Sequence, residues 1–429
     1  MQNQEDDMKI LRYLIIFAPL LLYGSTVSVV ESPYNDMKPY IASFNMDSPT
    51  FTLAWERGDT TVSCTIYVAI ENSDLTSISP LRLTEGNYID KNPIVTYLDS
   101  THPMIIWERK NNSYFQLYYS YYMGNNTWSY PEQIYSILGD ELYPYPYGKK
   151  LYFQSIGRIY YTYFSGSSWS SATIVSDINY DSYHPSFSTV TGLVYDVNLD
   201  GVWRIHRTDS LFTNTSTAPL YPMVTDYGNY LYTEKNGNIY SLIFYDGTSR
   251  HTIDTSNIFI GHHRIVDVGA ITKENTGDFE CYVKDEENRH VYASNWINGQ
   301  KYILNSGSYE GDYPSLCVIN GYRTLYKVPV IFQEYHDGKW DLYGNIFTLT
   351  NGGLEKHNGS PAQNSCIRIL YTKHAVEIMT NADGVIYRMD GIPVKRITAG
   401  NNEIISGTLN RGVYFLKLKT GQTKKLIIK

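Results

Sequence analysis

The chain has 429 residues, enough for two or three domains that each bury a core of their own. Its formal net charge of −8 argues against a protein that binds nucleic acid through a basic surface, and its ordinary apolar content argues against general disorder. The chain contains 42 Tyr but only 14 Phe and 7 Trp. Tyrosine favours strands, so this excess predicts many half-exposed β-strands, and some of the rings could instead form platforms for sugars.

The first predicted element is a leader at residues 1–28. After an acidic start come a basic segment at 8–12, an apolar run at 13–23 and small residues at 24–26. This order is typical of a secretory signal peptide, and the alternative is a signal anchor, although the run is short for a membrane span. No later stretch is apolar enough to cross a bilayer. We therefore expect a mature protein that is secreted or held at the outer-membrane surface.

A loose repeat between residues 33 and 356 predicts a β-propeller. The segment Thr52-Leu-Ala-Trp-Glu-Arg57 recurs as Met104-Ile-Ile-Trp-Glu-Arg109, and prolines at the ends of polar loops precede the strands at intervals of 51, 41 and 37 residues. Such a period is typical of a blade of three or four antiparallel strands, and radial stacking buries both faces of each sheet. Six or eight blades would also fit, but we count seven units, which begin near Pro39, Pro93, Pro144, Pro185, Pro222, Arg264 and Pro314.

The second unit has the clearest pattern, with Tyr118-Tyr-Ser-Tyr-Tyr122 followed by Trp128-Ser-Tyr-Pro131. This order resembles the repeats of sialidase-like propellers, and the segment 336–340, His-Asp-Gly-Lys-Trp, is similar to the Asp-box of that family. Hydrolysis in such enzymes would require three arginines, a Tyr-Glu pair and an acidic Asp. Arg57, Arg109 and Arg158 recur at blade spacing, but neither a Tyr-Glu pair nor an Asp stands beside them.

We therefore expect a module that binds glycan or protein, with a sialidase-like glycoside hydrolase as the alternative, and we name no catalytic residue. The candidate ligand contacts are Trp55, Arg57, Trp107, Arg109, Trp128 and Trp169. A purely structural explanation is that Trp and Arg share one face of a strand and stack between blades.

The residues that could hold a metal are not clustered, so we expect no metal and no cofactor. His262 and His263 are adjacent and would face opposite ways on a strand, and the segment 198–201 is first a hairpin turn. The four cysteines lack any C-x-x-C spacing; an exported chain could pair them, but buried single thiols are expected for Cys64, Cys281, Cys317 and Cys366.

The last part of the chain differs from the rest in charge. From Cys366 onward it has 11 basic and 4 acidic side chains, a net charge of +7, which leaves −15 for everything before it. This shift predicts a separate domain at 366–429. Short strands separated by Asp-Gly turns predict an immunoglobulin-like β-sandwich, which ends in a hairpin between Val413–Lys419 and Lys425–Ile428.

This final domain resembles the C-terminal sorting domain of proteins exported by the type IX secretion system of Bacteroidota. The matching segments are 381–387, 412–416 and 424–429, whereas the Tyr-Pro-Asn-Pro-like opening of the family is replaced at 369–373. The resemblance implies recognition by the type IX machinery and removal of the tail during export. The residues that it marks as the sorting signal are Gly384, Gly412, Tyr414, Leu416, Gly421, Lys425 and Lys429.

Overall fold

The computed structural model describes residues 26–356 apart from short gaps, together with seven strands between 368 and 428. The gaps are 31, 46–47, 60, 72–74, 76–77, 86, 136, 138, 208–209, 212–217, 226–227, 271–275, 296–299, 306–308, 323–324 and 351–352. All regular elements in the described part are β-strands, which confirms the predicted class. None of the described residues forms a helix long and apolar enough to cross a membrane. Contacts divide the chain into residues 1–358 and 359–429.

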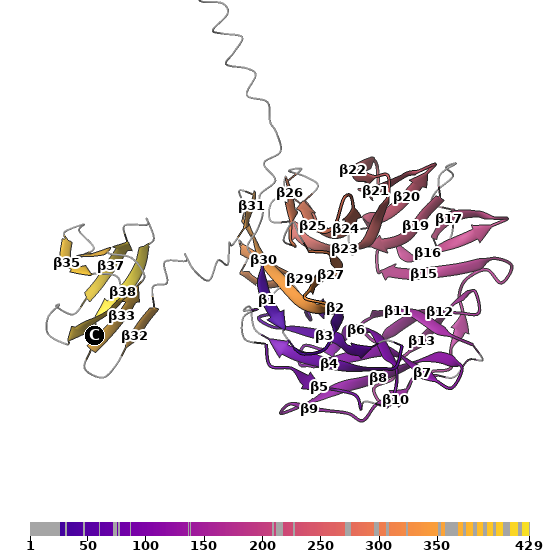
Figure 1. Ribbon diagram of the computed structural model, residues 1–429, viewed down its shortest axis with the longest axis horizontal. Coiled ribbons are helices and arrows are strands. Elements are labelled where there is room, and N and C mark those ends of the chain that lie inside the picture. The colour runs from indigo at the N-terminus through magenta and orange to yellow at the C-terminus, as the bar shows by residue number, and fades with distance from the viewer. Residues whose placement is uncertain are drawn as a thin grey trace, which may run out of the picture. The chain divides into compact units, whose positions relative to one another are not determined.

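The described part of the first unit contains seven antiparallel sheets, arranged around a common centre (Figure 1). This number confirms the seven-bladed propeller. Blade 1 consists of β2 (Asp36–Ala42), β3 (Phe51–Asp59), β4 (Ser63–Glu71) and β5 (Leu81–Arg82). Blade 2 consists of β6 (Asp90–Asp99), β7 (His102–Asn111), β8 (Tyr114–Gly124), β9 (Thr127–Trp128) and β10 (Glu132–Gln133). Blade 3 consists of β11 (Glu141–Tyr147), β12 (Lys150–Ser155), β13 (Arg158–Tyr163) and β14 (Thr173–Ile174).

Blades 4 to 6 each have four strands. Blade 4 consists of β15 (Asp181–Ser188), β16 (Gly192–Leu199), β17 (Val202–Arg207) and β18 (Ser210–Leu211). Blade 5 consists of β19 (Ala218–Val224), β20 (Tyr230–Asn236), β21 (Ile239–Tyr245) and β22 (Arg250–Ser256). Blade 6 consists of β23 (Phe259–Ala270), β24 (Thr276–Asp285), β25 (Arg289–Asn295) and β26 (Gln300–Ile303).

Blade 7 joins the two ends of the propeller. Its strands are β27 (Gly311–Leu316), β28 (Ile319–Tyr322), β29 (Leu325–His336), β30 (Lys339–Thr350) and β31 (Gly353–Lys356), and the strand β1 (Val27–Val30) pairs with β30. A strand from before blade 1 therefore closes the ring by hydrogen bonds. This strand precedes the expected propeller start at residue 33, and the expected leader at 1–28 overlaps it by two residues.

The apolar core lies between neighbouring blades. Seven clusters of buried apolar side chains each draw residues from two consecutive blades, including the pair formed by blades 7 and 1. Between blades 1 and 2, for example, Ile66 and Val68 pack with Ile105 and Trp107. Each sheet thus buries both faces against its neighbours, as the repeat predicted. Cys64, Cys281 and Cys317 are buried free thiols, as expected, and Cys366 lies outside the described residues.

The first strand of every blade has a β-bulge at the same place. Two residues of this strand lie opposite one residue of the second strand, and that one residue is a buried aromatic in all seven blades: Trp55, Trp107, Phe153, Tyr195, Tyr232, Tyr282 and Phe332. The second bulge residue is proline except in blade 6. The proline landmarks of the sequence were therefore bulges inside the strands rather than ends of loops.

The tail unit contains a three-stranded and a four-stranded antiparallel sheet. The first consists of β32 (Arg368–Tyr371), β33 (Ala375–Thr380) and β36 (Gly400–Ile405), and the second of β34 (Gly384–Arg388), β35 (Pro393–Ile397), β37 (Gly412–Leu418) and β38 (Thr423–Ile428). The terminal hairpin is confirmed, with Gly412 paired to Ile428 and Lys417 to Thr423. The immunoglobulin-like arrangement stays a prediction.

Of the expected sorting residues, Gly384 begins β34, Gly412, Tyr414 and Leu416 belong to β37, and Lys425 belongs to β38. Gly421 and Lys429 lie outside the described residues.

Glu141, at the start of β11, is a buried acid between blades 2 and 3. Its side chain accepts hydrogen bonds from the backbone N–H groups of Leu117 and Ile137, both at 2.9 Å. Burial raises the pKa of the Glu141 carboxyl to about 7, against the opposing effect of these two hydrogen bonds. Above this pH the folded protein holds a desolvated carboxylate beneath the propeller surface.

Stability should depend on pH through this group. Between pH 4.5 and about 7 the folded chain retains a proton that the unfolded chain has released, so the free energy of unfolding falls as pH rises through this window. We expect Glu141→Gln to reduce the difference between pH 5 and pH 8 by about 2 kcal/mol, as measured by urea unfolding. The exposed Glu287→Gln is the control and should keep the wild-type difference. An unchanged difference in Glu141→Gln would contradict the assignment.

Candidate functional site

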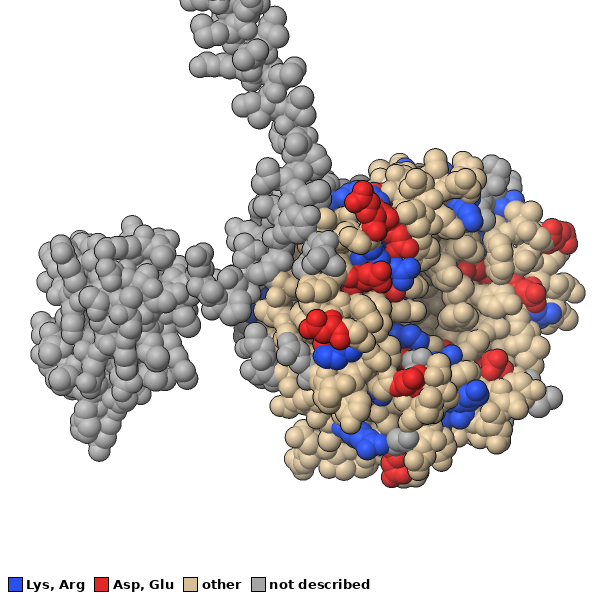
Figure 2. All heavy atoms as spheres, in the orientation of Figure 1, with Lys and Arg blue, Asp and Glu red and all other residues tan. Residues whose placement is uncertain are grey.

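The seven bulges surround a cavity of about 430 Å³ at the centre of the propeller. Figure 2 shows this face of the molecule hollowed near its centre, with acidic and basic side chains around the hollow. Each blade contributes its first bulge residue to the wall: Lys38, Asn92, Tyr143, His184, Tyr221, His262 and Tyr313. The seven backbones at these positions all have positive φ, between 45° and 58°. Non-glycine residues seldom adopt this conformation, so the bulge holds each side chain at a strained but fixed place. We call these seven residues the bulge ring.

The bulge ring is polar on the side of blades 1 and 2. The Lys38 ammonium donates to Asn92 Oδ1 at 2.8 Å and lies 3.3 Å from Glu56 Oε1, and Asn92 Nδ2 donates to Glu108 Oε2 at 2.8 Å. Burial opposes the charge on Lys38, but the Glu56 carboxylate raises the pKa of the ammonium above its ordinary value. Lys38 therefore remains a cation that is already neutralised by a carboxylate.

Aromatic rings form the opposite part of the bulge ring. The His184 imidazole lies between Tyr143 and Tyr221, with ring centroids 4.4 and 4.2 Å away, and both tyrosines remain more than 40% exposed. Its Nδ1 is 2.6 Å from Oδ2 of the fully buried Asp196. Burial raises the pKa of the Asp196 carboxyl, against the opposing effect of His184. The contact fixes the orientation of the imidazole and leaves Nε2 for another partner.

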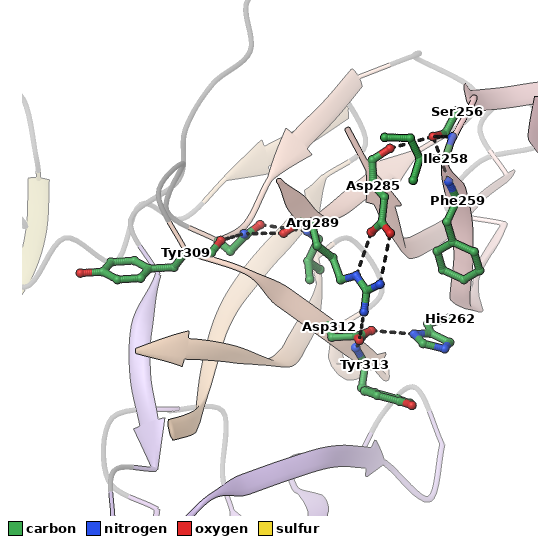
Figure 3. Close-up of polar contacts among 11 residues, drawn as sticks. Ser256, Ile258, Phe259, His262, Asp285, Arg289, Tyr309, Asp312 and Tyr313 are labelled. Atoms are coloured by element: carbon green, nitrogen blue, oxygen red, sulfur yellow. Dashed lines mark hydrogen bonds and ion pairs between the residues drawn. The ribbon is translucent and has the colours of Figure 1, made fainter. Parts of the chain in front are cut away.

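A second imidazole is held in the same way by blades 6 and 7 (Figure 3). His262 Nδ1 lies 2.6 Å from Asp312 Oδ1, and the other oxygen of Asp312 accepts from Arg289 Nη1 at 2.9 Å. Burial favours the neutral acid, but His262 and Arg289 together lower the pKa of the Asp312 carboxyl. Arg289 is itself held by Asp285 through two hydrogen bonds. His262 stacks on Tyr313 with centroids 4.4 Å apart.

Side chains of the second strands connect the bulge ring from blade to blade. The backbone N–H of Asn92 donates to Glu56 of the preceding blade, that of Tyr143 to Glu108 at 3.1 Å, and that of Tyr221 to Asp196 at 3.1 Å. The N–H of Lys38 makes the same kind of contact where blade 7 meets blade 1, by donating to Gln333 at 2.7 Å. Burial raises the pKa of Glu56 and of Glu108, because both carboxyl groups are fully shielded from water.

Comparison with known proteins finds only distant structural likenesses. No protein-family model matches the chain, and no curated protein sequence matches it. Among solved structures, the Hadza microbial sialidase Hz136 has a TM-score of 0.42 and 12% identity, with 75% of this chain and 68% of that one covered. The BP39L lectin from Burkholderia pseudomallei gives 0.47 and 8%, over 72% and 98%. An ulvan lyase of polysaccharide lyase family PL25 gives 0.45 and 9%, over 74% and 95%.

The repeated Trp-Glu-Arg segment forms a structural clamp with an aspartate of the first strand. Asp36 Oδ1 accepts from Trp55 Nε1 and from Arg57 Nε, both at 2.7 Å, and Trp55 is fully buried. In blade 2, Asp90 accepts in the same way from Trp107, also fully buried, and from Arg109. The rings are inside the core and the arginines are held by Asp36 and Asp90, which gives these four residues a structural role. Their contact with a ligand stays a prediction.

The two remaining tryptophans of the prediction lie on the outer part of their blades. Trp128 is half-buried and packs edge-to-face on Tyr122 at 5.4 Å, and Trp169 packs edge-to-face on Tyr119 at 5.8 Å. Neither lines the central cavity. Their contact with a ligand stays a prediction.

The structure does not bring the three arginines of the hydrolase alternative together. Arg57 and Arg109 belong to the clamps, and Arg158 binds carbonyl groups and the exposed Asp181 at the turn between β12 and β13. None of the three lines the cavity. The described residues also contain no group of three His, Cys, Asp or Glu side chains arranged to hold a metal.

Sequence reasoning missed the bulge ring, although its signal was present. Asn92, Tyr143, His184, Tyr221 and Tyr313 all stand directly before the prolines that marked the repeat. A residue before proline avoids the right-handed helical region, and a long polar or aromatic residue at the same place in every repeat indicates a shared wall. In the sequence these prolines indicate the period of the blades, but they do not show that the residues before them meet at one cavity.

The Asp90 clamp can be tested by stability. The Asp90 side chain is fully buried and that of Arg109 is 9% exposed, so Asp90→Ala leaves a guanidinium without its partner in the core. We expect a loss of about 3–5 kcal/mol in the free energy of unfolding, measured with urea. Asp181→Ala removes an ion pair whose carboxylate is 60% exposed, and should cost less than about 1 kcal/mol. Equal losses in the two variants would show that the clamp contributes no more than a surface pair.

Proposed function

We propose that this protein binds carbohydrate at the bulge ring of the propeller. The observation that carries the proposal is the group of exposed tyrosines and carboxylate-held imidazoles around one central cavity. Tyr143 and Tyr221 offer amphipathic ring faces, and pyranose rings present apolar C–H faces to such partners. His184, His262 and Asn92 supply polar groups that can select hydroxyl groups. A concave site with aromatic walls and a few oriented polar groups is the usual form of a small-molecule site.

Two features favour binding over hydrolysis. Among the residues that line the cavity, Glu108 is the only carboxylate, whereas glycosidases of the common type use two facing carboxyl groups. Glu108 is also occupied, because it accepts hydrogen bonds from Tyr143 N and Asn92 Nδ2. A carboxylate that holds the backbone of the next blade cannot also move to protonate a leaving group. The hydrolase is therefore the weaker of the two candidates.

We further propose that the protein is exported and that its C-terminal domain is the sorting signal. Support comes from the basic charge of the last domain, from the segments that resemble type IX sorting domains, and from the paired terminal hairpin. The leader would direct passage across the inner membrane, and the tail would direct passage across the outer membrane. Cleavage that leaves β1 intact must occur before Val27, because Val29 and Val30 are buried in the core of blade 7 and blade 1.

Substitution in the bulge ring should abolish carbohydrate binding without unfolding the protein. Tyr221 is 41% exposed, so Tyr221→Ala removes a ring face and leaves the core intact. We expect at least about a tenfold loss of affinity for whichever oligosaccharide a glycan array identifies, measured by calorimetry. Tyr130→Ala, at a ring that is 79% exposed and outside the cavity, should bind as the wild type does. Binding that survives Tyr221→Ala together with His184→Ala would place the ligand elsewhere.

The role of the C-terminal domain in export can be tested independently of ligand binding. Deletion of residues 412–429 removes β37 and β38, so the four-stranded sheet of the tail cannot form. In a bacterium with type IX machinery, we expect the truncated protein to accumulate in the periplasm while the full chain reaches the medium or the cell surface. Fractionation with a periplasmic marker measures this, and normal export of the truncated chain would refute the proposal.

A further inference from the structure

Blade 6 departs from the repeat at the cavity. In the other six blades the second bulge residue is proline, and the residue after it is uncharged: Tyr40, Ile94, Tyr145, Ser186, Met223 and Ser315. Blade 6 has His263 and Arg264 at these two places. Because the seven blades share one backbone geometry, the fold itself does not require this change. A local exception to an otherwise regular pattern is where a functional residue is expected.

Arg264 reaches into the channel from β23. Its guanidinium lies 5.6 Å from the ring centroid of Tyr40, on blade 1, and its Nη1 is 3.5 Å from Met223 Sδ, on blade 5. Blades 5 and 1 are not neighbours, since blades 6 and 7 stand between them. A side chain that contacts both must extend across the channel. Arg264, Tyr40 and Met223 all line the cavity, and they follow the bulge ring by two residues in each strand.

The charge of Arg264 has no counter-ion among the described residues. No described carboxylate lies within 4.0 Å of its guanidinium, whereas Lys38, the other cation of the cavity wall, is paired with Glu56. The Nε atom of Arg264 is buried without a hydrogen-bond partner, and Nη1 has only a long contact to its neighbour's carbonyl at 3.4 Å and to the Met223 sulfur. An uncompensated cation in a shielded place is costly unless an anion joins it.

The neighbouring histidine does not compete for such an anion. Burial lowers the pKa of His263 to about 3, so its ring is neutral at physiological pH. Its Nε2 donates to the carbonyl of Tyr221 at 2.7 Å, which ties the bulge of blade 6 to that of blade 5. The positive charge at this part of the cavity wall is therefore concentrated on Arg264.

We propose that the cavity selects an anionic saccharide, whose acidic group pairs with Arg264 while its pyranose ring packs on the bulge ring. This inference rests on the proposed carbohydrate binding and adds the class of sugar. The planar guanidinium matches a carboxylate or a sulfate through paired hydrogen bonds, and the contacts of its Nη1, at 3.4 and 3.5 Å, are long. A neutral sugar would leave the cation without a counter-ion.

The test compares acidic polysaccharides with neutral derivatives of the same polymers. Affinity electrophoresis of the full chain would use polygalacturonate and alginate with their carboxyl-reduced forms, and a sulfated galactan with its desulfated form. We expect at least one acidic polymer to retard the wild type, with at least about a tenfold weaker effect of its neutral form. The polymer pair that shows the difference tells carboxylate from sulfate.

The variants decide where the acidic group binds. Arg264→Gln should lose the preference for the acidic polymer by at least about tenfold, and Arg264→Lys, which keeps the charge, should retain part of it. Arg250→Gln makes the same change of net charge at a residue outside the cavity and should bind as the wild type does. Thermal melting of each variant confirms that it is folded, and Arg264→Lys provides the comparison if Arg264→Gln does not fold.

Three results would overturn the inference in distinguishable ways. Equal binding of acidic and neutral forms would refute the anionic class and leave carbohydrate binding intact. A preference that persists in Arg264→Gln would place the acidic group on another surface, such as the basic tail. Failure to bind any polymer or any glycan of an array would refute the proposed function, and the inference with it.

Discussion

The propeller depends on how the backbone N–H of each bulge is satisfied. A bulge takes residues out of the strand ladder, so their N–H groups need acceptors elsewhere, and proline at the second position removes one of these donors altogether. In three blades the first donor is satisfied by a side chain of the preceding blade: Asn92 by Glu56, Tyr143 by Glu108, and Tyr221 by Asp196. Lys38 and Gln333 make the same contact where the ring closes. These four pairs of neighbouring blades are thus joined by hydrogen bonds in addition to their apolar cores.

The same bulges create the candidate site. Because the first bulge residue has positive φ, its side chain turns into the channel, while the aromatic residue opposite it fills the core beneath. The buried acids that hold these backbones also hold the imidazoles, since Asp196 contacts both Tyr221 N and His184 Nδ1. The Asp196 carboxylate therefore both joins two blades and orients a side chain of the candidate site. Removal of Asp196 would be expected to loosen the blade contact and the imidazole together.

Blade 6 is the place where this regular arrangement changes. Val283, the residue after its aromatic Tyr282, has no polar group to hold the next blade, and the contact between blades 6 and 7 is made instead by His262, Asp312 and Arg289. The second bulge position loses its proline, and Arg264 follows. The regular blades supply a rigid ring, and the irregular blade supplies the one cation of the cavity wall that no described carboxylate neutralises.

The sequence by itself determined the all-β class, the seven blades, their starting points and the terminal hairpin, because hydrophobic alternation and proline spacing are local and repeat along the chain. It did not indicate the structural role of Trp55, Arg57, Trp107 and Arg109, whose side chains bind Asp36 and Asp90. It could not find the cavity, because the seven residues of the bulge ring come from strands that are distant along the chain. Only the closed ring brings them together, since cross-strand register and the positive φ of each bulge decide which side chains turn inward.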